Sequence, residues 1–459
     1  MLFSSLEFLY LFLPLSLIIY FLAPKRVRNA ILLVESLAFY AYGEIRMLWV
    51  MLLAILLNFV SGLLIFRAAT KKVKRLTLGV AVGLNVALLG FFKYTDFLLE
   101  NIGLSPLGIV LPLGISFYIF QAMSYVCDVY RGAVAQRSLV DFGAYVTMFP
   151  QLVAGPIVRY CDIDSELKHR ESRLSDIAEG IRIFSVGLAK KVLLANSAGK
   201  IREIFLGAGD GYITVVGEWA ALVFFAFQIY YDFGGYSDMA VGLGRIFGFH
   251  FPRNFNYPYI SRSITDFWRR WHITLSTWFR EYVYITLGGN RCSRVRMYFN
   301  LFVTWLLTGI WHGAEWCFTL WGIYFFLVLA IEKAFLGRLL SRLPRAFGHI
   351  YALFFILLGW FIFTCEDISG FFKIGRLFGV GVNGFVDGFA AYELSRHFSL
   401  LVIMAFGATP LAARLFEKAG SKLPRTVNCL RALLPPIAIL LSTASLAGDS
   451  YNPFLYFRF

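Results

Sequence analysis

The sequence predicts an all-α protein that crosses a membrane many times. Of its 459 residues, 59% are hydrophobic and only 15% are charged, whereas about a quarter of the residues in a soluble domain are charged. Aromatic residues make up 18%, as in helices whose rings gather at the two surfaces of a bilayer. Apolar stretches long enough to span a bilayer recur along the chain.

The expected spans follow one another from residue 6 to residue 446, and no linker or internal repeat divides them. We therefore treat residues 1–459 as one membrane domain with about twelve crossings. The weakest candidate is residues 177–198, which Arg182, Lys190 and Lys191 interrupt. The others are residues 6–23, 29–42, 47–66, 76–92, 107–127, 212–233, 297–311, 316–331, 347–364, 398–413 and 432–446.

The net charge of +15 has two interpretations, a nucleic-acid surface or an excess of Lys and Arg that holds loops in the cytoplasm. If the N-terminus lies outside, most of the 43 Lys and Arg residues fall in cytoplasmic segments. We therefore expect both termini outside the cytoplasm and no nucleic-acid partner. The six cysteines are scattered without a Cys-x-x-Cys spacing, so no metal site is predicted.

Glycine and proline predict helix breaks in two places. Residues 141–173 contain Pro150, Gly155 and Pro156, which interrupt any helix there. A broken segment at membrane depth is buried in protein or lines a cavity, so we expect a re-entrant element. Asp232-Phe233-Gly234 resembles a protein-kinase motif, but the other kinase motifs are not found with it. We therefore expect Gly234 and Gly235 to break a helix at the point where that helix leaves the membrane.

Residues 230–296 are too polar to span but rich in aromatic residues. Ser263 is suited to cap a helix, with Asp266 three residues later. An amphipathic helix lying in the cytoplasmic interface is predicted here. Phe267, Trp271, Leu275 and Trp278 share its apolar face. Two pairs four residues apart are expected to be neighbours on it, Asp266 with Arg270 and His272 with Ser276.

Two histidines stand beside tryptophan in or near the membrane. His312 follows Trp311 within residues 301–323, and a histidine in such an apolar stretch is costly unless it has work to do. Gly309 and Gly313 leave room beside it for another group or a substrate. A general base or acid and a helix-terminal histidine bonded to a carbonyl are the two interpretations. His272, in a polar stretch, is equally consistent with catalysis and with a structural role.

Arginines interleaved with aromatic residues form a basic surface on the predicted cytoplasmic side. One interpretation is anchoring to anionic lipid headgroups. The other is recognition of a phosphorylated acyl donor, with Arg on the phosphates and aromatic faces on an adenine. The arginines are Arg253, Arg262, Arg269, Arg270 and Arg280.

Three motifs together resemble the membrane-bound O-acyltransferases. They are Asn-Phe-Asn-Tyr-Pro-Tyr at 254–259, the Trp-Arg-Arg-Trp-His segment within 266–278, and Gly-Ile-Trp-His-Gly at 309–313. Residues 1–8, Gly155-Pro156 and residues 451–459 also match the bacterial branch of this family that acts in alginate O-acetylation. The resemblance covers essentially the whole chain.

This resemblance implies a ring of about 10–12 transmembrane helices, with re-entrant and interfacial helices around a thin central funnel. It places the family's near-invariant histidine on His312 and the second one on His272. It also implies a bacterial cytoplasmic membrane, a donor from the cytoplasm, an acceptor outside, and an extracytoplasmic partner protein that resembles an esterase-like acetyltransferase.

The resulting hypothesis is O-acetyl transfer from acetyl-CoA, a donor substrate rather than a bound cofactor, to an extracytoplasmic polysaccharide. Residues 230–296 would hold the donor, and a helix at about 297–323 would carry the catalytic histidine. His312 would deprotonate the acceptor hydroxyl while His272 assists or positions the thioester. The residues expected to bind substrate are Asn254, Asp266, Arg269, Arg270, Trp271, Ser276 and Trp311.

Two alternatives remain open at the level of sequence. A D-alanyl transferase acting on teichoic acid would use the same basic surface for a carrier protein. A transporter or polysaccharide-export channel would also place polar groups in the membrane, although the inverted repeats common in transporters are not evident. The sequence does not identify the polymer.

Overall fold

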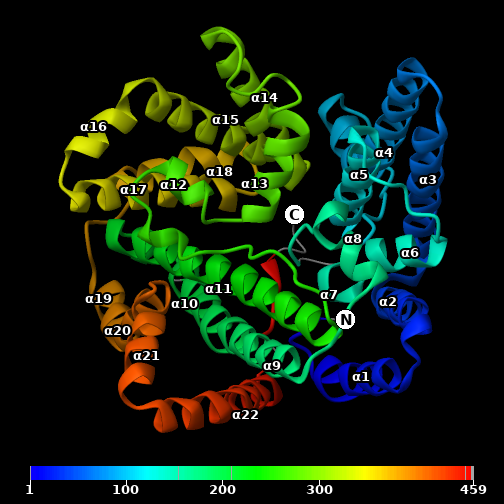
Figure 1. Cartoon of the computed structure of the whole chain (residues 1–459). Helices are drawn as coiled ribbons and strands as arrows, with labels where there is room; N and C mark the ends of the chain where they lie inside the picture. Colours follow the sequence, from blue (N-terminus) through cyan, green and yellow to red (C-terminus); the bar gives the residue numbers. More distant parts are fainter. Residues whose placement is uncertain (1, 153–154, 208, 450, 456–459) are drawn as a thin grey trace. The chain divides into compact units, whose positions relative to one another are not determined.

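The computed structural model describes residues 2–152, 155–207, 209–449 and 451–455. Every regular element in these ranges is a helix, as predicted (Figure 1). The chain divides into two compact units, Met1–Phe184 with Tyr236–Arg253 and Ser185–Gly235 with Asn254–Phe459. The single domain, the ring and the central funnel therefore stay predictions.

Unit 1 holds the first helices of the chain. Its helices pack closely against one another. A Cβ on Gly62 of α3 would lie 2.3 Å from the Tyr125 ring of α5, and Asn58 and Asn85 exchange two buried hydrogen bonds of 2.9 Å between α3 and α4. Its helices are α1 (Leu13–Leu22), α2 (Arg28–Glu44), α3 (Leu48–Arg67), α4 (Lys71–Asn101), α5 (Ile115–Arg131), α6 (Leu139–Thr147), α7 (Phe149–Leu152) and α8 (Tyr160–Lys168).

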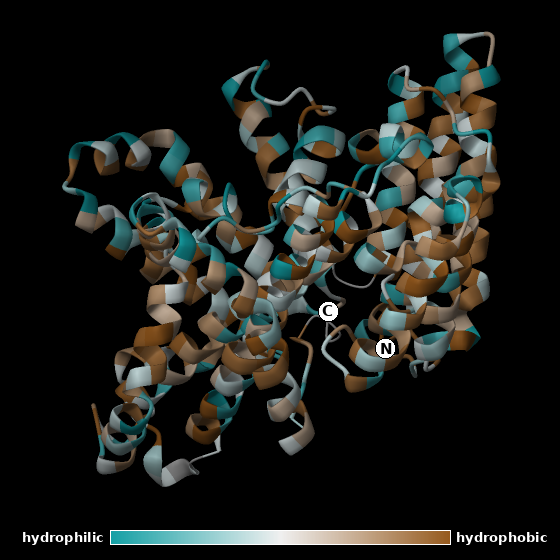
Figure 2. Cartoon of the chain, turned by 60° about the horizontal axis from the view of Figure 1, so that its bottom comes forward, coloured by the Kyte–Doolittle hydropathy of each residue, from teal (hydrophilic) through white to brown (hydrophobic). Residues whose placement is uncertain are grey.

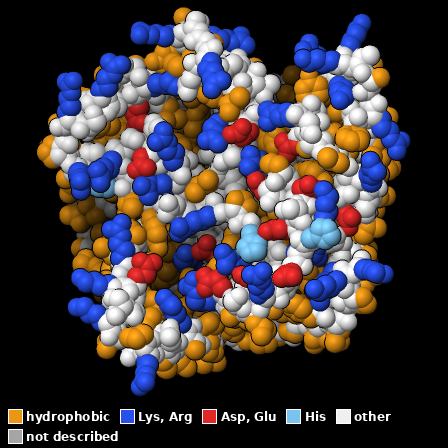
Figure 3. Space-filling view, viewed as in Figure 1, with side chains coloured by type: hydrophobic (Ala, Val, Ile, Leu, Met, Phe, Trp, Pro, Cys, Tyr) orange, Lys and Arg blue, Asp and Glu red, His pale blue; other side chains and the backbone are white. Residues whose placement is uncertain are grey.

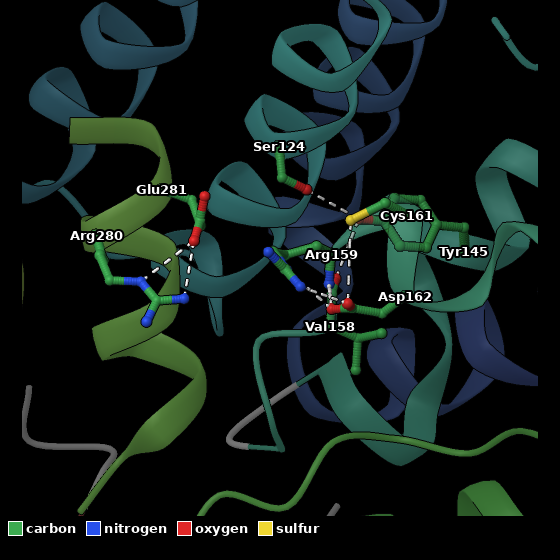
Figure 4. A network of polar contacts seen from close by, with 8 residues as sticks. All are labelled: Ser124, Tyr145, Val158, Arg159, Cys161, Asp162, Arg280 and Glu281. Carbon is green, nitrogen blue, oxygen red and sulfur yellow. Dashed lines mark hydrogen bonds and ion pairs between the residues drawn. The ribbon is translucent and has the colours of Figure 1, made fainter. Parts of the chain in front are cut away.

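The predicted break in residues 141–173 is present. α6 ends at Thr147, α7 is one turn, and residues 155–159 before α8 have no regular structure. Phe149 and Leu152 are fully buried, as a broken segment inside a membrane protein requires. Val153 and Ala154 lie outside the described residues, and re-entry into the membrane stays a prediction. Arg159 and Asp162 pair at the start of α8, 2.7 Å apart (Figure 4).

α9 (Leu174–Ala189) and α11 (Val215–Phe247) contribute residues to both units. The remaining α-helices and the π-helical turn η4 belong to unit 2. They are η4 (Lys190–Ala195, a π-helical turn), α10 (Asn196–Leu206), α12 (Ile264–Trp268), α13 (Ile273–Phe279), α14 (Arg294–His312), α15 (Trp316–Ile331), α16 (Gly337–Arg342), α17 (Arg345–Thr364), α18 (Ile368–Phe372), α19 (Gly388–Arg396), α20 (Phe398–Gly407), α21 (Leu411–Lys422) and α22 (Pro424–Gly448).

The surface of the helices is suited to lipid. Large hydrophobic side chains are exposed on many of them, including Leu56 on α3, Leu84 on α4 and Leu440 on α22, and Figure 2 shows hydrophobic residues running along the helices. Among the described residues, four helical segments are long and apolar enough to cross a membrane, or five if one bent pair is counted as a span. The prediction of 10–12 crossings stays a prediction.

Three sequence expectations are wrong in detail. The glycines after Asp232 do not break a helix, because α11 runs through them without interruption. The single catalytic helix expected at 297–323 is two helices, α14 ending at His312 and α15 beginning at Trp316, in agreement with the separate spans expected at 297–311 and 316–331. The helix expected from Ser263 is divided into α12 and α13 at His272.

Candidate active site

His312 is the last residue of α14. The helix ends there because Gly313 adopts extended backbone, with φ −166° and ψ 162°. α15 then packs tightly against α14, and the glycines admit this neighbouring helix. A Cβ on Gly309 would lie 2.4 Å from the Phe318 carbonyl oxygen and 3.1 Å from the Cα of Gly322. Only 6% of His312 is exposed.

Aromatic rings enclose the His312 imidazole. Its ring centroid lies 5.1 Å from that of Trp311, 5.0 Å from that of Trp321 and 5.3 Å from that of Phe363, with the planes steeply inclined. These rings come from α14, α15 and α17. Most of the imidazole's surroundings therefore have low polarity, which strengthens the electrostatic interactions made by a group that charges during a reaction.

His272 occupies the bend between α12 and α13. Its φ of 43° is in the left-handed region, which few residues with a side chain adopt. Its imidazole is buried, with 1% of the residue exposed, and Nδ1 lies 3.1 Å from the Oδ1 atom of Asn254. The same oxygen accepts hydrogen bonds from the backbone N–H of Thr274, at 3.3 Å, and its hydroxyl, at 2.9 Å.

These contacts determine the tautomer of His272. A backbone N–H only donates, so the Asn254 atom that Thr274 contacts is the carbonyl oxygen. Nδ1 of His272 faces that oxygen and therefore carries a proton, which leaves the lone pair of a neutral imidazole on Nε2. Burial lowers the pKa of His272 well below its ordinary value, and nearby His312 lowers it further. Both effects keep the imidazole neutral.

The two histidines lie on either side of Trp311. Ring centroids are 6.2 Å apart between His272 and Trp311 and 5.1 Å apart between Trp311 and His312. The Phe233 ring packs edge-on against His272, at 4.7 Å. All four residues belong to unit 2. The structure thus brings together two histidines that are separated in the sequence by thirty-nine intervening residues.

The other predicted residues divide into buried and accessible ones. Arg270 pairs with Asp266 at 2.9 Å, as its spacing predicts, and Arg269 is exposed. Trp271 is buried between Phe255 and Trp360, at 5.0 and 4.7 Å. It therefore does not present a free face to an adenine.

Ser276 meets His272 through the backbone, its N–H donating to the His272 carbonyl at 3.1 Å. This is the contact that the spacing of the two residues predicts. The residues expected on one apolar face of a surface helix, Phe267, Trp271, Leu275 and Trp278, are all buried inside unit 2.

Several contributors were not predicted from sequence. Glu332 is buried and caps the start of α12, accepting hydrogen bonds from the backbone N–H of Ile264 and of Thr265 at 2.6 and 2.9 Å. An acidic residue directly after an apolar stretch was the available signal. No sequence signal identified Thr274, Phe233 or Phe363, because their roles depend on contacts with residues distant in the sequence. Within the described ranges, no group of three His, Cys, Asp or Glu is placed to hold a metal.

Comparison with known proteins identifies the family. The family model for MBOAT, the membrane-bound O-acyltransferase family, matches residues 36–374. The chain belongs to the membrane-bound O-acyltransferases. It is therefore a multi-pass membrane acyltransferase, and the transporter alternative is set aside. His272 and His312 both lie within the matched range.

Relatives in this family carry related activities. The chain is 39% identical to a probable alginate O-acetylase AlgI of Azotobacter vinelandii, over the full length of both. It is 34% identical to a peptidoglycan O-acetyltransferase of Helicobacter pylori, over 84% of this chain and 80% of that one. A teichoic acid D-alanyltransferase of Streptococcus thermophilus is 28% identical over 49% of this chain and 58% of its own.

Proposed function

We propose that this membrane-bound O-acyltransferase moves an acetyl group from cytoplasmic acetyl-CoA across the bacterial cytoplasmic membrane for O-acetylation of an extracytoplasmic polysaccharide. Full-length similarity to alginate O-acetylases supports acetyl over D-alanyl transfer, since the D-alanyltransferases match about half of the chain. An extracytoplasmic, esterase-like partner protein would complete transfer to the polymer. The observation that carries the proposal is the buried pair of histidines on either side of Trp311.

Proton transfer is assigned to the histidines. His312 takes the proton of the acceptor hydroxyl as its oxygen attacks the thioester carbon. The carbon–sulfur bond then breaks, and the thiolate of coenzyme A leaves and is protonated. General-base assistance of this kind contributes about 10²–10⁴-fold to the rate. His272, with its lone pair on Nε2, assists this transfer or positions the thioester.

Asn254 is suited to polarise the thioester carbonyl. Its side chain is buried, and in the described part of the chain its Nδ2 atom has no hydrogen-bond partner. A buried amide N–H without an acceptor is costly in a resting protein. A carbonyl oxygen that gains negative charge during attack would accept this hydrogen bond, as in an oxyanion hole.

The arginines around the site provide charge for the phosphates of acetyl-CoA. Arg269 is exposed, as are Arg262 and Arg280, and Figure 3 shows many Lys and Arg side chains on the face that it presents. Arg270 is tied to Asp266 and to the Asn256 carbonyl, so its role is to shape the Trp-Arg-Arg-Trp-His turn. Lipid headgroups would share this basic surface.

The proposal is tested by supplying purified enzyme in proteoliposomes with acetyl-CoA labelled in the acetyl group, together with its partner and a candidate polysaccharide. Mass spectrometry of the polymer is expected to show acetyl groups. D-alanyl groups supplied from a carrier protein, with no transfer from acetyl-CoA, would contradict the proposal and support the alternative. The polymer itself is identified by testing alginate and peptidoglycan in parallel.

A further inference from the structure

We propose that a buried ion pair between Lys191 and Asp232 positions His272. The pair fixes the turn of α11 that contacts His272, and it holds residues 451–455 against that turn. This inference rests on the proposed function, because it assigns Lys191 and Asp232 as positioning residues for acetyl transfer. All of the groups involved belong to unit 2.

The pair is deeply buried, and both side chains make further hydrogen bonds. Nζ of Lys191 lies 2.9 Å from Oδ1 of Asp232, with 1% and 2% of the two side chains exposed. Lys191 also donates to Oδ1 of Asn196, at 2.8 Å, and to the Pro453 carbonyl. The second carboxylate oxygen of Asp232 accepts the backbone N–H of Leu455 at 2.9 Å. Buried charges are stable only when such partners surround them.

Residues 451–455 supply two of the three described residues that form hydrogen bonds with the ion pair, the third being Asn196. One carbonyl and one N–H of this segment bind the cation and the anion respectively. Asn196 adds a hydrogen bond from Nδ2 to the Tyr451 carbonyl at 3.2 Å. The segment and the ion pair therefore stabilise each other, and neither is satisfied in this arrangement without the other.

Glycine makes the geometry of the pair rigid. A Cβ on Gly235 of α11 would lie 2.7 Å from the Gly187 carbonyl oxygen and 3.0 Å from the backbone nitrogen of Lys191. The two helix backbones thus touch directly, one turn from Asp232. This contact explains Gly235, the second of the two glycines that follow Asp232-Phe233.

The connection to His272 runs through the next residue. Phe233 follows Asp232, and its ring contacts the His272 imidazole at 4.7 Å and the Phe255 ring at 5.0 Å, both edge-on. Phe255 in turn follows Asn254, the partner of His272 Nδ1. A shift of the helical turn that carries Asp232 would therefore displace the Phe233 ring that packs on His272. Through Phe255 it would also displace Asn254, the hydrogen-bond partner of His272.

Two substitutions test this without touching the proposed catalytic groups. Asp232→Asn removes the anion at constant size, and Leu455→Pro removes the N–H that Asp232 accepts. We expect kcat to fall at least tenfold in both variants while the KM for acetyl-CoA changes less than twofold. The matched control is Tyr451→Phe, which removes only the hydrogen bond from the Tyr451 hydroxyl to Glu203 on the same segment and is expected to keep the parent kcat.

A neutral double variant, Lys191→Met with Asp232→Leu, separates positioning from stability. Hydrophobic pairs of similar volume often replace buried ion pairs without loss of stability. If the pair positions His272, this variant melts at the parent temperature but keeps a kcat at least tenfold lower. A double variant with the parent melting temperature and parent kcat, or parent kcat in Leu455→Pro, overturns the inference. A parent enzyme that transfers nothing from acetyl-CoA contradicts the proposed function, and the inference with it.

Discussion

At the scale of single residues, the site depends on one strained bend and one amide. His272 adopts a left-handed conformation that costs a residue with a side chain about 1–2 kcal/mol. The bend turns its imidazole inward, where Asn254 fixes the proton on Nδ1. Strain retained at such a position is characteristic of functional sites.

His312→Ala is expected to lower acetyl transfer by about 10²–10⁴-fold, the usual contribution of a general base. The rate is measured in proteoliposomes with labelled acetyl-CoA, after membrane insertion has been verified. The control is His250→Ala, since His250 is exposed and belongs to unit 1. Parent activity in His312→Ala would rule out His312 as the base.

Asn254→Ala is expected to lower kcat by about tenfold to a hundredfold, because a buried N–H that loses its acceptor costs about 1–3 kcal/mol. The loss includes the hydrogen bond proposed for the thioester carbonyl. Thr274→Val removes a second hydrogen bond to the same Asn254 oxygen and serves as the control, with a smaller loss expected. Equal kcat values for the two variants would argue against a special role for Asn254.

At the scale of helices, the two histidines of the site lie where a helix ends or is interrupted. α14 ends at His312, and α12 and α13 meet at His272. Periodicity predicts which residues share a face, and all four of those residues are indeed buried. It does not predict the break, because the bend at His272 is stabilised by Asn254 and Glu332, which lie outside the local pattern.

Gly309→Val is expected to displace α15 from α14 and to lower both activity and stability, since even a Cβ there would lie 2.4 Å from the Phe318 carbonyl oxygen. Forcing extra atoms into a packed contact typically costs about 1–3 kcal/mol. Thermal unfolding in detergent measures the change. Gly83→Ala on α4, where a Cβ meets nothing within 4 Å, is expected to unfold at the parent temperature or above it. If Gly309→Val unfolds at the parent temperature, the helix contact is not required.

At the scale of the whole molecule, charge determines the expected orientation. Because Lys and Arg are retained in cytoplasmic loops, a short cysteine-containing tag at either terminus is expected to react with a membrane-impermeant thiol reagent in intact spheroplasts. A matching tag in the loop after residue 67, which is followed by several lysines, is expected to react only after lysis. Labelling of the terminal tags only after lysis would reverse the predicted topology.

The sequence by itself determined the class of this protein. Hydrophobic composition, basic loops and the motifs around His272 and His312 predicted a helical membrane acyltransferase, and family comparison confirms that class. These properties are encoded locally, in composition and short spacings. Only the tertiary structure placed both histidines against Trp311, assigned the proton of His272 through Asn254, and paired Lys191 with Asp232. Each of these contacts joins residues far apart in the chain, and helical periodicity carries no information about which distant side chains will meet.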